Sequence, residues 1–164
     1  MDLIAANRDI LSKITHALDN PETGKRGQQI LLFECNSQDF GISILETHEI
    51  LKPVPITRLP NVEPEILGMI NLRGNIIPVI DLGRKFFGRY ISVTPQCRII
   101  ICHQNESHYS GFLVDRIGRV VSMEDEANEW PEARDLSGGY FRGVGRSLSK
   151  VYLILDLGVL LSRQ

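Results

Sequence analysis

The feature that most constrains this sequence is an internal repeat. Gly68 is followed 13 residues later by Asp-Leu-Gly at 81–83, and Gly143 is followed 13 residues later by Asp-Leu-Gly at 156–158. The offset between the copies is 75 residues in a chain of 164, close to half its length. Similarity at this scale predicts two copies of one supersecondary unit.

The two copies differ where the predicted hairpin of each unit turns. The first copy carries Asn71-Leu72-Arg73-Gly74 at this turn, and the second carries Arg146-Ser147-Leu148-Ser149. A shared scaffold with two different turns predicts that the charged turn of the first copy is presented on one side of the molecule only.

Short apolar and β-branched runs alternate with turn residues over most of the chain, which predicts strands. The predicted strands are 29–35, 40–44, 51–57, 68–72 and 76–81 in the first half, and 98–103, 109–114, 118–123, 140–145 and 150–155 in the second. Five strands per half predict an all-β fold of two packed five-stranded SH3-like barrels, with short helices. Pro78 lacks the backbone N–H, so its strand is predicted to be an edge strand or to bend there.

Several predicted strands are apolar on both faces. The runs at 30–33, 76–80 and 98–102 show this pattern rather than strict alternation. Burial on both faces predicts that one set of side chains fills a barrel and the other set fills the joint between the barrels. The two halves are therefore expected to unfold together.

The N-terminal residues differ from the rest of the chain. Apolar residues in 2–19 recur at the period of an amphipathic helix, and 20–27 combine Pro, Gly and charge as a linker does. The predicted division is a helix and linker in 1–28, followed by one folded domain in 29–164. Within that domain, two intertwined barrel subdomains are expected at about 29–90 and 91–164.

Composition argues against several classes of function. Lys and Arg number 18 against 20 acidic residues, and a net charge of −2 gives no general attraction to nucleic acid. No signal sequence and no apolar run long enough to span a membrane is found, which predicts a cytoplasmic protein without direct membrane insertion. Cys35, Cys97 and Cys102 form no C-x-x-C pair, so buried, reduced thiols are expected.

No arrangement of residues typical of an enzyme is found, so the chain is predicted to be non-enzymatic, with no cofactor and no metal site. His103 and His108 flank one predicted turn and could meet Cys102 across a hairpin, but solvent exposure is the simpler interpretation. The glycine-rich stretch 138–147 departs from the phosphate-binding loop in its spacing and lacks the lysine. A small-molecule or nucleotide-binding regulatory module remains the alternative, because small barrels can hold ligands at their mouths.

Two segments leave alternatives open. Arg73 could recognise a carboxylate across an interface, or it could bind Glu46, Glu49 or a backbone carbonyl of its own barrel. Residues 45–51 are either a solvent-facing turn or a docking edge with an apolar centre and a polar rim.

These motifs, taken in order, resemble the CheW family of bacterial chemotaxis coupling proteins. The matching runs are Phe40-Gly41-Ile42-Ser43-Ile44, Glu49-Ile50, Arg58-Leu59-Pro60, the stretch Gly-Met-Ile-Asn-Leu-Arg-Gly-Asn-Ile-Ile-Pro-Val-Ile-Asp-Leu at 68–82, Gly-Phe-Leu-Val-Asp at 111–115 and Tyr-Phe-Arg-Gly at 140–143. The resemblance covers about residues 29–161 and implies two five-stranded SH3-like barrels.

The resemblance also implies function and partners. It implies a non-enzymatic adaptor that binds the regulatory domain of a CheA-type histidine kinase and the cytoplasmic tips of methyl-accepting chemoreceptors. The residues implied in kinase binding are Ile44, Thr47, Glu49 and Gly68, and those implied in receptor binding are Asn71, Leu72, Arg73 and Gly74. Thr47 departs from the family, which usually has valine there. Its added hydroxyl bears on kinase affinity or partner choice.

Overall fold

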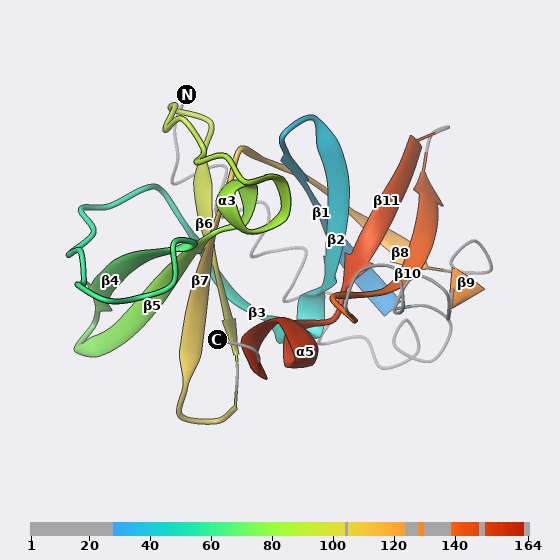
Figure 1. The fold of residues 1–164 in the computed structure, drawn as a ribbon. Helices are drawn as coiled ribbons and strands as arrows, with labels where there is room; N and C mark the ends of the chain where they lie inside the picture. Colours follow the sequence, from blue (N-terminus) through green and yellow to red (C-terminus); the bar gives the residue numbers. More distant parts are fainter. Residues whose placement is uncertain (1–27, 104, 124–127, 130–138, 148–149, 163–164) are drawn as a thin grey trace.

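The computed structural model describes residues 28–103, 105–123, 128–129, 139–147 and 150–162 (Figure 1). Its elements are β1 (Gln28–Cys35), β2 (Gln38–Ser43), the 3₁₀ turn η1 (Ile44–Glu46), β3 (Thr47–Leu51), β4 (Ile66–Leu72), β5 (Asn75–Asp81), α3 (Leu82–Phe87), β6 (Arg98–His103), β7 (Tyr109–Val114), β8 (Arg116–Met123), β9 (Asn128–Glu129), β10 (Phe141–Ser147), β11 (Lys150–Leu155) and α5 (Leu157–Ser162). The predicted N-terminal helix and linker lie outside the described residues.

The strands form two sheets of closely related topology. The six-stranded sheet has the order β8-β1-β2-β11-β10-β9, in which β9 is only two residues long, and the five-stranded sheet has the order β3-β6-β7-β5-β4. Each sheet contains one parallel pair, β2 with β11 and β5 with β7. The remaining pairs are antiparallel. The all-β prediction with two five-stranded barrel units is confirmed, since β9 only extends one edge.

The sheets do not divide the chain near residue 90. The β1–β2 hairpin belongs to the six-stranded sheet, but η1 leads the chain out of it and β3 pairs with β6 in the other sheet. Conversely, β8 follows β7 but pairs with β1. At this return the Asp115 N–H donates to the Glu34 carbonyl at 3.0 Å. The edge strand β3 of the five-stranded sheet thus follows a hairpin of the six-stranded sheet, and the edge strand β8 of the six-stranded sheet follows a hairpin of the five-stranded sheet. Both sheets therefore contain strands from either side of residue 90.

The internal repeat corresponds to a hairpin followed by a short helix, β4–β5–α3 and β10–β11–α5. Asp81 caps the first helix by accepting from the Arg84 N–H at 3.0 Å, and Asp156 accepts from the Val159 N–H at 3.2 Å. An acceptor at the N-cap satisfies a helix N–H that has no partner within the helix. The repeated aspartate therefore begins a helix in both copies.

One local prediction is wrong, and of the two alternatives predicted for Pro78 the edge strand is excluded. The strand expected at 51–57 is instead β3 at Thr47–Leu51, and of the later residues only Thr57 makes a bridge, to Met69. Pro78 does not mark an edge, because β5 lies between β7 and β4. The pairing of β5 with β7 covers only Val79 to Asp81, so the proline lies just outside that ladder.

The two-sided burial predicted from the sequence is confirmed. Along β6, Ile99 and Ile101 belong to the core of the five-stranded sheet, whereas Ile100 and Cys102 belong to a larger cluster drawn from both sheets. In β1, Ile30 belongs to a third cluster, with Tyr152 and Ile154 of β11. We call the larger cluster the seam; its buried members are Leu31, Phe33, Cys35, Phe40, Ile42, Ile44, Ile50, Ile80, Leu82, Ile100, Cys102, Phe112, Val114, Leu155, Leu157, Leu160 and Leu161.

The three cysteines are buried and unpaired, as expected. Burial is the main cause that raises the pKa of the Cys35 thiol to about 12 and that of Cys102 further still. A thiol held protonated is a poor nucleophile and a poor metal ligand. No described helix has the length and apolar character needed to cross a membrane.

A substitution that overpacks one barrel tests whether the seam makes unfolding cooperative. In Gly111→Ala the new Cβ would lie 2.9 Å from Ile99 Cγ2 and 3.2 Å from Ile101 Cδ1. Overpacking of this kind costs about 1–3 kcal/mol. We expect calorimetry to show one unfolding transition with a lowered Tm. Two transitions, with only one displaced, would contradict a shared seam.

Gly158→Ala is the matched control. It makes the same change at an exposed glycine of α5, where the nearest atom to the new Cβ, Asp156 Oδ1, is 3.3 Å away. Since alanine also favours a helix over glycine, its Tm should be unchanged or slightly higher.

Candidate functional site

The β4–β5 turn is a tight two-residue hairpin connection. Leu72 pairs with Asn75, which leaves Arg73 and Gly74 as the loop, with φ angles of 51° and 87°. Positive φ at both loop residues is the pattern of a type I′ turn, whose twist matches that of the flanking strands. The Asn71 side chain accepts from the Gly74 N–H at 2.9 Å, which fixes the turn. The backbone thus presents Arg73 at the tip.

Arg73 is held by Glu49 of β3. Its Nη1 and Nη2 donate to the two carboxylate oxygens of Glu49 at 3.0 and 2.7 Å. The arginine side chain is still 69% exposed, whereas that of Glu49 is 15% exposed. The hydrogen bond and the charge of Glu49 raise the pKa of Arg73. Both alternatives left open by the sequence are therefore compatible with this geometry: Arg73 binds its own barrel and remains accessible.

Three of the four residues implied in kinase binding are buried. Ile44 and Gly68 lie in the interior, and Thr47 is only 5% exposed. The Thr47 hydroxyl donates to the Ser43 carbonyl at 3.3 Å, across η1. Glu49 alone of the four has a partly accessible side chain, and the structure joins it to Arg73 of the other set. Leu45, next to Ile44, is exposed.

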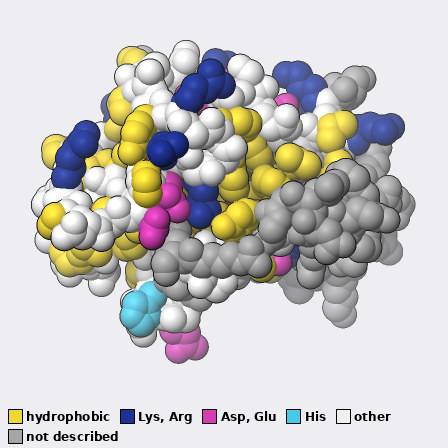
Figure 2. Space-filling model, in the orientation of Figure 1, with side chains coloured by type: hydrophobic (Ala, Val, Ile, Leu, Met, Phe, Trp, Pro, Cys, Tyr) yellow, Lys and Arg dark blue, Asp and Glu magenta, His cyan; other side chains and the backbone are white. Residues whose placement is uncertain are grey.

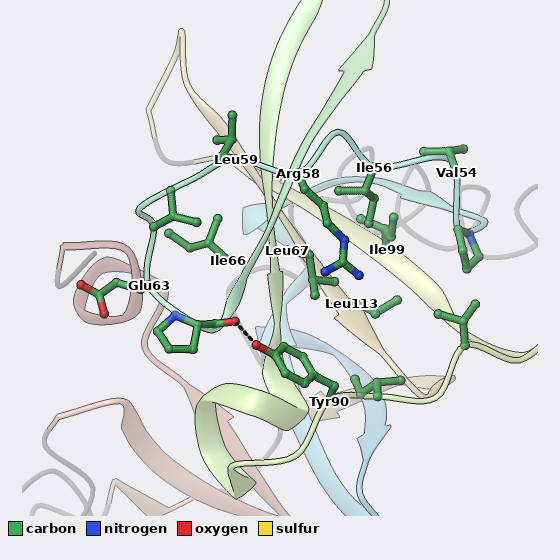
Figure 3. Close-up of a pocket in the computed structure, with 15 residues that line it drawn as sticks. Val54, Ile56, Arg58, Leu59, Glu63, Ile66, Leu67, Tyr90, Ile99 and Leu113 are labelled. Atoms are coloured by element: carbon green, nitrogen blue, oxygen red, sulfur yellow. Dashed lines mark hydrogen bonds between the residues drawn. The ribbon is translucent and has the colours of Figure 1, made fainter.

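A groove of about 690 Å³ lies beside the five-stranded sheet (Figure 3). It lies between the loop 53–64 with the start of β4 on one side and the segment 90–93 on the other, and Ile99 and Leu113 also line it. Five exposed large hydrophobic residues line this groove: Val54, Leu59, Val62, Tyr90 and Val93. Arg58 points toward Leu67 and Leu113 within the groove (Figure 3). Exposed apolar side chains gathered in one concavity are typical of an interaction site.

Gly68 shapes one wall of this groove. Its φ is +148°, and a Cβ there would lie 2.1 Å from the Thr57 carbonyl oxygen and 2.8 Å from Ile56 Cγ2. The absence of a side chain lets Thr57 bridge to Met69, with the Thr57 N–H donating to the Met69 carbonyl at 2.9 Å. Ile56 is thereby brought to the groove lining. Gly68 acts on this surface through the backbone.

The groove itself was not predicted from the sequence. Leu59 and Val62 lie in a loop without strand or helix periodicity, and Val54 fell in the strand wrongly predicted at 51–57, so none of the three was given a binding role. The available signal was apolar residues at non-periodic positions, together with Arg58-Leu59-Pro60 among the matching motifs.

Much of the apolar surface visible elsewhere, over β2 and β11 beside α3, lies outside this groove (Figure 2).

Glu46, at the end of η1, carries a partly buried carboxyl group. Its Oε2 atom is buried and has no hydrogen-bond partner. Burial raises the pKa of Glu46 above the ordinary 4.5; Arg142 opposes this shift and Asp156 adds to it. The sequence offered Glu46 as a partner for Arg73, but Glu49 takes that role.

His103 and His108 are both exposed, which confirms the simpler interpretation of the sequence. His108 Nδ1 lies 2.9 Å from the Asn105 side-chain oxygen within the exposed turn, and Cys102 is fully buried, so neither gathers with His103. His103 instead packs against His48 and Tyr109. Burial and the neighbouring His48 lower the pKa of His103. Among the described residues, no group of three or more His, Cys, Asp or Glu side chains could hold a metal.

Comparisons with known proteins agree with the fold and the motifs. The CheW-like domain family matches residues 29–164. The chemotaxis protein CheW of Klebsiella aerogenes is 31% identical over 140 residues, covering 84% of each chain. That of Bacillus subtilis is 36% identical over 109 residues, covering 66% of this chain and 69% of its own. The crystal structure of the scaffolding protein TtCheW from Thermoanaerobacter tengcongensis matches with a TM-score of 0.71 and 30% identity, covering 80% of this chain and 85% of that one.

Two packed SH3-like barrels, together with the structural likeness to the scaffolding protein TtCheW, define the class of this protein as a non-enzymatic scaffold. The chain belongs to the CheW-like domain family, which matches it over 29–164. The sequence-based resemblance is thereby confirmed, and so is the prediction that the protein is not an enzyme.

Neutralising Glu46 should stabilise the protein at alkaline pH. Because its pKa is higher in the folded than in the unfolded chain, the folded state holds the proton more tightly. The free energy of unfolding therefore falls as pH rises from the ordinary carboxyl range through the raised value. In Glu46→Gln this loss is absent. We expect urea denaturation to show a more stable variant at about pH 8 and little difference at about pH 4, where the acid is protonated.

Glu63→Gln is the control, since Glu63 is an exposed acid in the loop of the groove. It should show no comparable gain at either pH. If Glu46→Gln were less stable than the native protein at about pH 8, the buried carboxylate would have to be compensated by another group.

Proposed function

We propose that this protein is a cytoplasmic adaptor that couples methyl-accepting chemoreceptors to a CheA-type histidine kinase, in chemotaxis or a related motility pathway. The observation that carries the proposal is the ion pair between Glu49 and Arg73. It joins one residue implied in kinase binding to one implied in receptor binding. The chemotaxis names of the relatives from Klebsiella aerogenes and Bacillus subtilis support the same pathway.

The proposed receptor contact is the β4–β5 turn, residues 71–74. Asn71 and Gly74 form the turn, and Leu72 ends the strand that leads into it. Arg73 is already oriented by Glu49, so it loses less side-chain entropy on binding than a free arginine would. Its guanidinium can still bind a further partner, because much of the side chain is in solvent. A helical receptor tip with a carboxylate or a free carbonyl would suit this donor.

The proposed kinase contact is centred on the groove and extends to η1 and β3. The exposed apolar residues of the groove supply the buried centre of an interface, and Arg58 and Glu63 supply polar groups around it. Ile44, Thr47 and Gly68 act from below this surface: Gly68 places Ile56, and Ile44 belongs to the seam under η1. Their implied roles are thus explained by support of the surface rather than by direct contact.

The proposed mechanism is geometric. Glu49 lies on β3 and Arg73 on the β4–β5 turn, at opposite edges of the five-stranded sheet order, and their ion pair ties the two together. A shift of the turn on receptor binding would be transmitted to β3, and a kinase bound there could respond to it. Weak contacts of this kind gain strength when repeated in an array.

Reversing the charge of Arg73 should uncouple the receptor while leaving the fold intact. Arg73→Glu removes the exposed guanidinium and places a carboxylate beside Glu49. We expect a far-ultraviolet circular dichroism spectrum like that of the native protein. Receptor-stimulated autophosphorylation of the kinase should fall. Unaltered stimulation would contradict a receptor role for this turn.

The double exchange Glu49→Arg with Arg73→Glu separates the two roles of the arginine. It restores an ion pair between β3 and the turn but reverses the charge presented at the tip. If the surface charge binds the receptor, the double variant stays uncoupled. If only the internal tie matters, coupling returns.

An acidic side chain in the groove should weaken kinase binding. Val54 is 40% exposed and lines the groove, so Val54→Glu places a charge at the centre of the proposed interface. Loss of a central apolar contact, with a charge to desolvate, predicts affinity lower by about tenfold or more. Calorimetric titration with the kinase regulatory domain measures this directly.

Val151→Glu is the matched control. Val151 is 49% exposed, but it lies on β11 of the other sheet and outside the groove. Its affinity for the kinase should match that of the native protein. Equal weakening by both substitutions would remove the groove from the proposed interface.

A further inference from the structure

Three aromatic rings meet at one end of the five-stranded sheet. His48 comes from β3, His103 is the last residue of β6, and Tyr109 is the first residue of β7. Their ring centroids are 4.8 to 5.1 Å apart. Both histidines are exposed, so an ion can reach them from solvent. Figure 2 shows histidine side chains on this face only near the β6–β7 hairpin.

The backbone explains why the two imidazoles converge. Thr47 pairs with Cys102, and the register of β3 against β6 shifts between Thr47 and Glu49. His48 is the extra residue at this irregularity, and a β-bulge of this kind re-aims the side chain it carries. His48 and His103 are thereby brought together although they are 55 positions apart in the sequence.

The separation of the two rings suits chelation of one ion. With zinc–nitrogen bonds of about 2.0–2.1 Å in a tetrahedral site, two imidazole ring centres on one ion lie about 5 Å apart. The observed centroid separation of His48 and His103 is 4.9 Å. Imidazole nitrogen is a preferred ligand of zinc, copper and nickel, and solvent can fill the remaining positions.

Among the described residues, no third ligating side chain joins these two histidines. Both carboxylate oxygens of Glu49 bind Arg73, and Cys102 is buried. Tyr109 packs against both imidazoles and restricts their rotation. We infer that His48 and His103 form an exposed two-histidine site for a divalent transition-metal ion, with zinc as its simplest occupant. The ion would link the edge strand β3 to β6.

Calorimetric titration of the untagged, reduced full-length chain with zinc chloride tests this site. We expect one zinc ion per chain in the native protein. His48→Ala and His103→Ala should each weaken binding by about tenfold or more, because each removes one of two protein ligands. His108→Ala is the matched control, since His108 is an exposed histidine of the adjacent turn bonded to Asn105. It should bind zinc as the native protein does.

Thermal unfolding gives a second measurement. An ion that binds only the folded chain raises Tm, and the rise should be present in the native protein and His108→Ala but absent from His48→Ala. Tyr109→Phe keeps the ring contacts and should retain the rise. The proposal is overturned if the native protein binds no zinc, if the His48 and His103 variants bind it as well as the native protein, or if His108→Ala loses it equally. None of these results bears on the adaptor role, which needs no metal.

Discussion

The seam between the two sheets is the interaction on which the rest of this structure depends. Phe40 shows how it works: its ring lies 5.7 Å from Phe33 of β1, 5.7 Å from Phe86 of α3 and 5.9 Å from Phe141 of β10. A helix that follows the five-stranded sheet is thereby packed onto strands of the other sheet. Lys85 of α3 reinforces this contact over the Tyr140 ring at 4.9 Å and binds Glu65 at 3.2 Å. Neither barrel could expose this face to water without losing about 1.5–3 kcal/mol for each large apolar side chain.

The exchange of edge strands follows from the same constraint. Ile44 of η1 and Ile50 of β3 both belong to the seam, so the chain crosses between the sheets through the shared interior. The strand that carries Glu49 is thereby anchored at both ends. An anchored β3 gives Glu49 a fixed position, and Glu49 in turn fixes the exposed Arg73. The accessible side chain on the turn is thus positioned, through one ion pair, by the buried core.

Much of the architecture could be predicted because local patterns in the sequence indicate it. The continuous apolar run along β6, which places Ile99 and Ile101 on one face and Ile100 and Cys102 on the other, predicted burial on both faces. The repeated Asp-Leu-Gly at 81–83 and 156–158 predicted two copies of one unit, whereas the helix that begins after each aspartate was found only in the structure. The strand β3 was harder to predict, because its place depends on long-range pairing that leaves no local periodicity. The groove, the Glu49–Arg73 pair and the His48–His103 contact have the same origin: each joins residues from separate segments.

Thr47 shows how structure changes the meaning of a sequence departure. At a position where the resemblance leads one to expect valine, a buried hydroxyl without a partner would be costly. Here the hydroxyl donates to the Ser43 carbonyl four residues earlier, a local bond open to threonine but not to valine. Ser43 also accepts from the Leu45 N–H at 3.3 Å, so both side chains brace η1. The Thr47 hydroxyl therefore forms its hydrogen bond within η1, the turn through which the chain passes from one sheet to the other. Its effect on a partner would therefore act through the position of β3 rather than through contact with the hydroxyl.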